Sequence, residues 1–87
     1  MKQYTDLKLI NKTILYNLIT DENIRQIQKW GIQTHSSFEW LTYTTEELGE
    51  LANAIGEYEY RDGEKEKVVN EAIQVATLAL KIAEMYL

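Results

Sequence analysis

The chain has 87 residues, which is enough for one domain at most, and a domain of this size buries only a marginal core of its own. It contains no cysteine, which excludes disulfides and thiolate metal sites. The 14 acidic and 9 basic residues give a net charge of -5, which argues against a nucleic-acid polymer as partner, because such binding needs a basic face. An acidic balance suits a site that collects divalent cations, although solubility alone also accounts for it.

Nothing in the sequence predicts a membrane partner. It has no run of about 18 apolar residues, the length that a membrane-spanning helix requires. The first residues, Met1 to Asp6, lack the apolar core of a secretion signal. We therefore expect a cytoplasmic protein that does not bind a membrane.

The first third of the chain shows two helical patterns. Apolar residues at helical spacing run from about Asp6 to Ile19, and Thr5 or Asp6 can cap the start of this helix. A second apolar stripe leads to Gly31, a residue type that commonly ends helices, and Asp21 is the expected N-cap of this shorter helix. The alternative is one helix that continues through Asp21 with a kink.

Two long helices are predicted for the remainder of the chain. The first spans about 38–60, with Ser36 or Ser37 as its N-cap and Glu39 placed opposite Ser36 as in a capping box. The second spans about 64–86. There is no proline and there are only 4 glycines, so long helices are permitted almost everywhere. The predicted fold class is therefore all-α, with residues 1–87 forming a single domain around two long antiparallel helices.

The predicted helices carry more apolar surface than one small domain can cover. In the helix at 38–60, the 3.6-residue period is carried by Leu41, Leu48, Leu51, Ala52, Ile55 and Tyr58. The helix at 64–86 is apolar over a wide arc, which indicates burial on more than one side, inside a bundle or at a subunit interface. We therefore expect oligomerisation, at least to a dimer, to complete the bundle.

Three glutamates stand where the apolar pattern makes a charge costly. Glu71 lies within the apolar stripe of the last helix, and a buried charge needs a cation, a hydrogen-bonding cluster or water. Glu47 and Glu50 are three residues apart and share one face of the preceding helix, beside its apolar stripe. Gly49 lies between them, and a close approach by a neighbouring backbone or a substrate would explain a glycine in mid-helix.

Two simpler interpretations stay open for these carboxylates. Glu71 can pair with a lysine, and the segment with Glu47 and Glu50 can be a solvated face. Against both, two packed helices can direct carboxylates toward one point, and carboxylate oxygens with water are the ligands that Mg²⁺ prefers. The spacing therefore favours a Mg²⁺ site, with Mn²⁺ as the alternative cofactor.

The sequence resembles the MazG-like nucleotide pyrophosphohydrolases. The similarity extends over about residues 26–86 and is carried by Lys-Trp-Gly-Ile-Gln-Thr-His at 29–35, Trp-Leu at 40–41 and Glu-Glu-Leu-Gly-Glu-Leu-Ala at 46–52. The family signature is EExxE followed by ExxD, and 20 residues separate Glu50 from Glu71 here. Members are all-α oligomers that cleave a nucleoside triphosphate into a monophosphate and pyrophosphate with Mg²⁺.

The resemblance implies a set of functional residues. Glu47, Glu50 and Glu71 would be metal ligands, with Gln74 at the fourth ligand position, where the signature has aspartate. Glutamine still offers a carbonyl oxygen but carries no charge, so a nucleotide-binding or regulatory module with weakened catalysis is the alternative function. Glu46, with Glu47, would provide the catalytic carboxylates. A purely structural helical interaction protein is the third possibility.

Four further residues are candidates for binding the nucleoside triphosphate. Trp30 can stack on a base or simply close the core, and Gln33 can hydrogen-bond a base edge. His35 can contact phosphate or base, or be an exposed loop histidine. Lys81 can neutralise phosphate, or be a solvated lysine. The sequence indicates neither the preferred base nor the preferred sugar.

Overall fold

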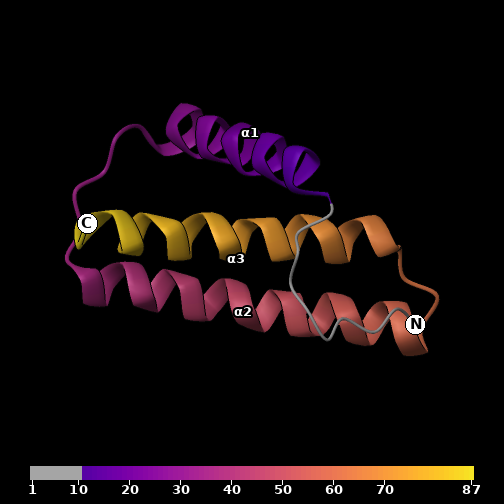
Figure 1. Cartoon of the computed structure of the whole chain (residues 1–87). Helices are drawn as coiled ribbons and strands as arrows, with labels where there is room; N and C mark the ends of the chain where they lie inside the picture. The colour runs from indigo at the N-terminus through magenta and orange to yellow at the C-terminus, as the bar shows by residue number, and fades with distance from the viewer. Residues whose placement is uncertain (1–10) are drawn as a thin grey trace.

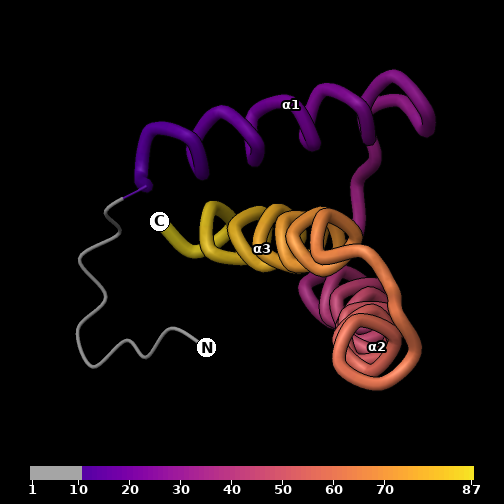
Figure 2. The backbone as a smooth tube through the Cα atoms, turned by 90° about the vertical axis from the view of Figure 1, so that its right-hand side faces the viewer, coloured from indigo at the N-terminus to yellow at the C-terminus, as the bar shows by residue number. Residues whose placement is uncertain are grey.

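The computed structural model describes residues 11–87 and contains three helices in this range: α1 (Lys12–Trp30), α2 (Ser37–Tyr60) and α3 (Lys65–Met85). α2 and α3 lie side by side and antiparallel, and α1 packs on α3 (Figure 1). In Figure 2, α3 lies between the other two helices. The all-α prediction and the two long antiparallel helices are confirmed. None of the three helices is long and apolar enough to cross a bilayer.

α1 is one continuous helix through Asp21, so the prediction of a separate helix capped by Asp21 is wrong and the alternative of a helix that continues through Asp21 is confirmed. Neither glycine nor proline interrupts this stretch, and the side chain of Glu22 is satisfied locally by Arg25 and Gln26, three and four residues on. The helix ends as predicted at Gly31, whose φ of 74° lies in the region that favours glycine. The predicted start of this helix and its caps lie outside the described residues.

A capping box starts α2, as the sequence predicts. The Ser36 side chain accepts a hydrogen bond from the Glu39 backbone N–H at 3.2 Å, and the Glu39 carboxylate accepts one from the Ser36 N–H at 2.9 Å. At the same end of the bundle, the Tyr86 hydroxyl donates to the Ser37 hydroxyl at 2.7 Å. This last bond joins the start of α2 to the end of α3.

The turn between α2 and α3 requires its glycine. Asp62 has a positive φ of 57°, and the Gly63 N–H donates to the Glu57 carbonyl oxygen at 2.8 Å. A Cβ atom at position 63 would lie 2.8 Å from the Glu57 carbonyl carbon, which is closer than atoms can pack. The tight reversal brings the start of α3 back along α2 and so places Glu71 opposite the carboxylates of α2.

The covered face of α2 coincides only in part with the face that the apolar period indicates. Buried and half-buried positions on α2 include Thr44, Glu47, Leu51 and Ala54. Four members of the predicted stripe are instead 44–54% exposed: Leu41, Leu48, Ile55 and Tyr58. Leu51, another member of the stripe, is half-buried, so the stripe is covered only in part within the single chain. In the single chain, α2 therefore leaves apolar side chains exposed, whereas the side chain of Glu47 is half-buried.

Candidate metal centre

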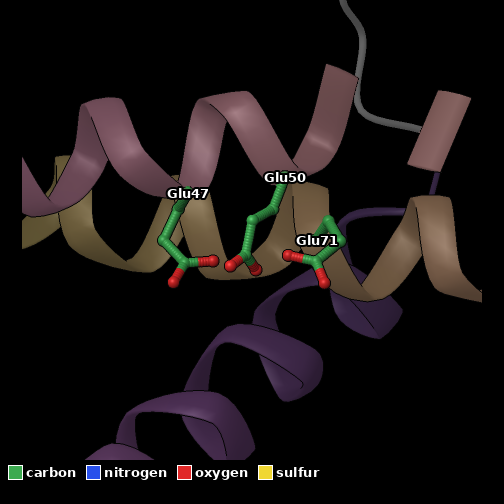
Figure 3. A group of neighbouring side chains, drawn as sticks. All are labelled: Glu47, Glu50 and Glu71. Carbon is green, nitrogen blue, oxygen red and sulfur yellow. The ribbon is translucent and has the colours of Figure 1, made fainter. Parts of the chain in front are cut away.

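Three carboxylates from two helices meet at one point of the α2–α3 interface. Glu47 and Glu50, one helical turn apart on α2, and Glu71 on α3 each offer an oxygen, and these oxygens lie within 4.8 Å of one another. Figure 3 shows the three carboxylates turned toward a common space between the helices. We call this group the glutamate cluster. The spacing in the sequence predicted that Glu47 and Glu50 share a face, and the antiparallel pairing of the helices adds Glu71.

The glutamate cluster is electrostatically unsatisfied. Glu71 is only 9% exposed, and one carboxylate oxygen each of Glu71 and Glu47 is buried without a hydrogen-bond partner among the described residues. Burial, followed by the negative charges of Glu50 and Glu71, raises the pKa of Glu47 above its ordinary value. No ion pair within residues 11–87 involves a cluster member, so the lysine pairing considered for Glu71 is not found there.

The residues of the glutamate cluster fit a hard divalent cation. Mg²⁺ and Mn²⁺ bind carboxylate oxygens, and a cation between the three groups would satisfy both orphaned oxygens and remove the mutual repulsion. Buried polar atoms are almost always partnered in folded proteins, so two orphaned oxygens in one cluster require an explanation. A cation bound between the three carboxylates would explain both oxygens, because it would be their partner.

A pocket of about 630 Å³ lies beside the glutamate cluster. We call it the aromatic pocket, because its apolar lining comes from Trp30, Trp40, Tyr43, Leu78 and Met85. Its polar lining includes Arg25, Gln33, Glu46, Glu47, Gln74 and Lys81. Its volume falls within the roughly 300–1,000 Å³ that is common for small-molecule sites. An apolar pocket with a few polar groups that reaches a carboxylate of the cluster is suited to a ligand that is part aromatic and part charged.

Most of the residues predicted from the sequence lie on this pocket. Trp30, Gln33, Gln74 and Lys81 line it, and so does Glu46, which is exposed and stands outside the glutamate cluster. Gln74 is half-buried and contributes to the pocket wall.

His35 is not part of the pocket lining. Its ring packs edge-on against Trp40 and Tyr43, with centroids 4.8 and 5.2 Å away. Its Nε2 atom lies 3.3 Å from the side-chain oxygen of Gln33, and its Nδ1 atom lies 3.6 Å from the Glu39 carboxylate. His35 therefore contacts two aromatic residues of the pocket lining, Trp40 and Tyr43, without lining the pocket itself. Sequence reasoning did not identify Trp40 and Tyr43 as pocket residues, although their aromatic type at i, i+3 spacing near His35 was visible.

A chain of hydrogen bonds connects α1 to α3 at the pocket wall. Lys81 donates to the side-chain oxygen of Gln26, and Gln26 donates to the Glu22 carboxylate at 2.7 Å. Arg25 binds the same carboxylate through two nitrogens at 2.7 and 2.8 Å. The Lys81 ammonium also lies 5.2 Å from the centroid of the Trp40 ring. We call these four residues the α1–α3 relay.

The surroundings of the α1–α3 relay change the pKa values of Glu22 and Lys81. Burial disfavours the charge on Glu22, but hydrogen bonds from Arg25 and Gln26 and the nearby positive charges outweigh it and lower the pKa of Glu22. Burial lowers the pKa of Lys81, with Glu22 opposing the shift. Sequence reasoning found only Lys81 of the relay, because Glu22, Arg25 and Gln26 look like ordinary surface pairs until α1 is placed against α3.

The glutamate cluster lies between two hollows of the surface. Glu47 lines the aromatic pocket, whereas Glu50 and Glu71 line a second, polar hollow together with Asn53, Glu57 and Lys67. A cation held by all three carboxylates would be reached from both sides.

No family model, curated protein or solved structure matches this chain. The functional assignment therefore depends on the residues and their geometry. The observations that carry it are the glutamate cluster with its buried, unpartnered oxygens and the aromatic pocket that adjoins it.

Proposed function

We propose that this chain is a Mg²⁺-dependent nucleoside triphosphate pyrophosphohydrolase, for which Mn²⁺ can replace Mg²⁺. The observation that carries the proposal is the glutamate cluster, in which three carboxylates converge within 4.8 Å and Glu71 is buried with an unpartnered oxygen. Bound Mg²⁺ would supply a Lewis acid for the phosphates and lower the pKa of a water molecule. The ligands would be Glu47, Glu50 and Glu71, with Gln74 as a neutral fourth ligand.

The aromatic pocket provides the rest of the proposed substrate site. Trp30, Trp40 and Tyr43 offer faces and edges on which a nucleobase can stack, and Gln33 offers a donor and an acceptor for a base edge. Lys81 provides positive charge on the pocket wall for phosphate. His35 supports this wall through Trp40 and Tyr43 rather than lining it.

The proposed reaction is attack of water on the α-phosphorus. A new phosphorus–oxygen bond forms there while the bond from the α-phosphorus to the bridging oxygen breaks, so that pyrophosphate leaves and a nucleoside monophosphate remains. Glu46, exposed on the pocket wall, would accept the proton of the attacking water, with Glu47 as the neighbouring carboxylate.

A panel of nucleoside triphosphates assayed for pyrophosphate release with Mg²⁺ tests the proposal. The parent protein should release pyrophosphate, and Glu71→Gln should abolish the release. Glu59→Gln is the matched control, because Glu59 is an exposed glutamate of α2 outside the glutamate cluster. Absence of release from every nucleotide, with the protein folded, would refute the enzyme proposal.

A nucleotide-binding or regulatory module is the second candidate, and Gln74 favours it. A half-buried neutral side chain on the pocket wall supplies no charge to a metal. Such a module would bind Mg²⁺ and nucleotide without turnover. A purely structural helical protein would bind neither, so a Mg²⁺ titration separates it from the other two.

We also propose a homodimer or homotetramer. Support comes from the stripe of Leu41, Leu48, Ile55 and Tyr58 on α2, whose members are 44–54% exposed and recur at helical spacing. Burial of this stripe against a second copy would complete the bundle. We further propose a cytoplasmic location, with neither a membrane nor a nucleic-acid polymer as partner. Sedimentation of a well-folded monomer at high micromolar concentration would refute the oligomer.

A further inference from the structure

Two cations from different helices converge on the wall of the aromatic pocket. Arg25 comes from α1 and Lys81 from α3, and both line the pocket together with Glu46 and Glu47. The pocket therefore has an acidic end beside the glutamate cluster and a basic wall. The charge on the basic wall comes from residues 56 positions apart in the chain, which meet because α1 packs on α3.

The α1–α3 relay holds both cations in place without exhausting their donors. Arg25 uses two of its five N–H groups on Glu22, and Lys81 uses one of its three on Gln26. Gln26, the link between them, is only 5% exposed, so this end of the relay is fixed within the helix packing. An oxyanion in the pocket can thus be met by the remaining donors without any rearrangement of the relay.

The position of Arg25 relative to the glutamate cluster indicates what kind of anion fits. Arg25 and Glu47 line the same pocket, so their side chains border one space. The hydrogen bonds that Arg25 donates to Glu22 are the main cause that raises the pKa of Arg25, and the charges of Glu47 and Glu71 add to it. A ligand held at the glutamate cluster through a divalent cation would therefore extend negative oxygens toward Arg25. The phosphate groups of a nucleotide carry such negative oxygens along a chain, and the planar guanidinium of arginine can bind two of these oxygens at once.

We infer that Arg25 and Lys81 together form the binding site for the phosphate chain of the ligand. The inference deepens the proposed function by assigning Arg25 a direct contact with substrate phosphates. The competing interpretation is that the relay only fastens α1 to α3. Under that interpretation, loss of Arg25 would alter stability and leave phosphate affinity unchanged.

Calorimetric titration with inorganic tripolyphosphate in the presence of Mg²⁺ tests the inference. Arg25→Gln and Lys81→Gln should each weaken tripolyphosphate binding about ten-fold or more, the usual effect of losing a hydrogen bond from a charged group. Lys29→Gln is the matched control, because Lys29 is a neighbouring cation of α1 that lies over Trp30 but does not line the pocket. The Lys29→Gln variant should bind tripolyphosphate with the same affinity as the parent protein.

A second arm uses a nucleoside triphosphate with a methylene bridge between the α and β phosphates, which resists hydrolysis. The same variants should weaken it by the same factor as tripolyphosphate. If they weaken the nucleotide alone, these residues contact the base or sugar and the inference is overturned. It is also overturned if the parent does not bind tripolyphosphate, or if neither variant changes its affinity.

The experiment separates this inference from the proposed function. Tripolyphosphate binding requires no turnover, so a protein that hydrolyses no nucleotide can still show the predicted losses. Conversely, if the parent is active but substitution of Arg25 and Lys81 leaves the affinity for tripolyphosphate unchanged, only the inference is refuted. The Arg25 side chain is 46% exposed but its partner Glu22 is only 10% exposed, so Arg25→Gln should also lower stability, and a circular dichroism spectrum before each titration checks that the variant is folded. Arg25→Lys, which keeps the charge but loses the fork, should give an intermediate affinity.

Discussion

Glu47 on α2 and Glu71 on α3 each hold a buried carboxylate oxygen that no donor among the described residues meets, and the two side chains belong to one cluster within 4.8 Å. Such an arrangement destabilises the folded chain by itself, because two desolvated like charges repel. It becomes favourable when a cation enters. The proposed divalent metal would therefore stabilise the fold.

The first prediction is that Mg²⁺ raises the melting temperature. A ligand at a hundred times its Kd stabilises the folded state by about 2.7 kcal/mol. In a domain of this size that corresponds to roughly 10 °C or more. Thermal unfolding with and without millimolar Mg²⁺ measures the shift, which should vanish in Glu71→Gln and persist in Glu59→Gln. An equal shift in the parent and in Glu71→Gln would show that Mg²⁺ binds elsewhere.

The second prediction concerns pH in metal-free buffer. Burial and the neighbouring Glu50 and Glu71 raise the folded-state pKa of Glu47 above 4.5, its value in the unfolded chain. The folded state therefore binds this proton more tightly, and stability falls as the pH rises from 4.5 through the folded pKa. The lowered pKa of Glu22 acts in a different window, because its stabilising contribution is lost only below pH 4.5.

Denaturant unfolding at a series of pH values checks this dependence. Glu47→Gln removes the titrating group, so its stability should exceed that of the parent at neutral pH and should decline less as the pH rises. The matched control is again Glu59→Gln, which should retain the slope of the parent. Parallel curves for the parent and Glu47→Gln would refute the assignment of the slope to Glu47.

The third prediction compares two glycines. Gly49 lies in the middle of α2, and a Cβ atom built there meets no described atom within 4 Å, so the expected close approach of a neighbouring backbone is not found. Gly49→Ala should therefore stabilise the protein by about 0.5–1 kcal/mol, through better helix propensity. Gly63→Ala should destabilise it, because the new Cβ would clash with the Glu57 backbone at 2.8 Å.

Activity measurements on Gly49→Ala test the other explanation for this residue. If substrate approaches the helix at position 49, the variant should be more stable and yet turn over nucleotide more slowly. If turnover is unchanged, the glycine serves neither packing nor substrate. Gly63→Ala provides the contrast of a stability defect at a position that lines the polar hollow and not the aromatic pocket.

The sequence predicted the local features of this fold well, because they depend on neighbours in the chain. The capping box at Ser36, the helix end at Gly31 and the burial of Glu71 all follow from residues within a few positions. The sequence left both a separate helix and a continuous one open at Asp21, because Asp21 has the type of an N-cap while the neighbouring Glu22 can accept hydrogen bonds from Arg25 and Gln26 within one helix. Local patterns do not decide between these two uses of an acidic residue.

Features that depend on how the helices are placed could not be predicted. The apolar period of α2 identified Leu48 and Ile55 but not the face that meets α3, which instead includes Glu47 and Ala54. Likewise, Arg25 reads as an ordinary i, i+3 partner of Glu22 until α1 lies on α3. All three members of the glutamate cluster were predicted, because Glu47 and Glu50 are three residues apart on one helix and Glu71 lies in the apolar stripe of the helix expected to run antiparallel to it.

The last prediction concerns Gln74, which lines the aromatic pocket beside Glu46 and Glu47 but stands outside the group of converging carboxylates. If its side chain meets the metal, Gln74→Asp adds an anionic oxygen, and Mg²⁺ affinity should rise several-fold, because hard cations favour charged oxygen ligands. Turnover can change in either direction, since the shorter side chain alters the position of whatever it contacts. Gln74→Glu keeps the length and adds the same charge, which separates the effect of charge from that of reach.

Calorimetric Mg²⁺ titrations and pyrophosphate release decide the role of position 74. Ala79→Asp is the control for charge alone, because it adds a carboxylate at an exposed position of the same helix. A rise in affinity for both position-74 variants, absent in Ala79→Asp, supports a direct ligand. Recovery of pyrophosphate release by Gln74→Asp from an inactive parent would identify the chain as a binding module that lost its catalysis through this residue. An affinity that stays at the parent value in both variants would mean that position 74 does not face the metal, and that the three carboxylates of the glutamate cluster bind it without a fourth side chain from α3.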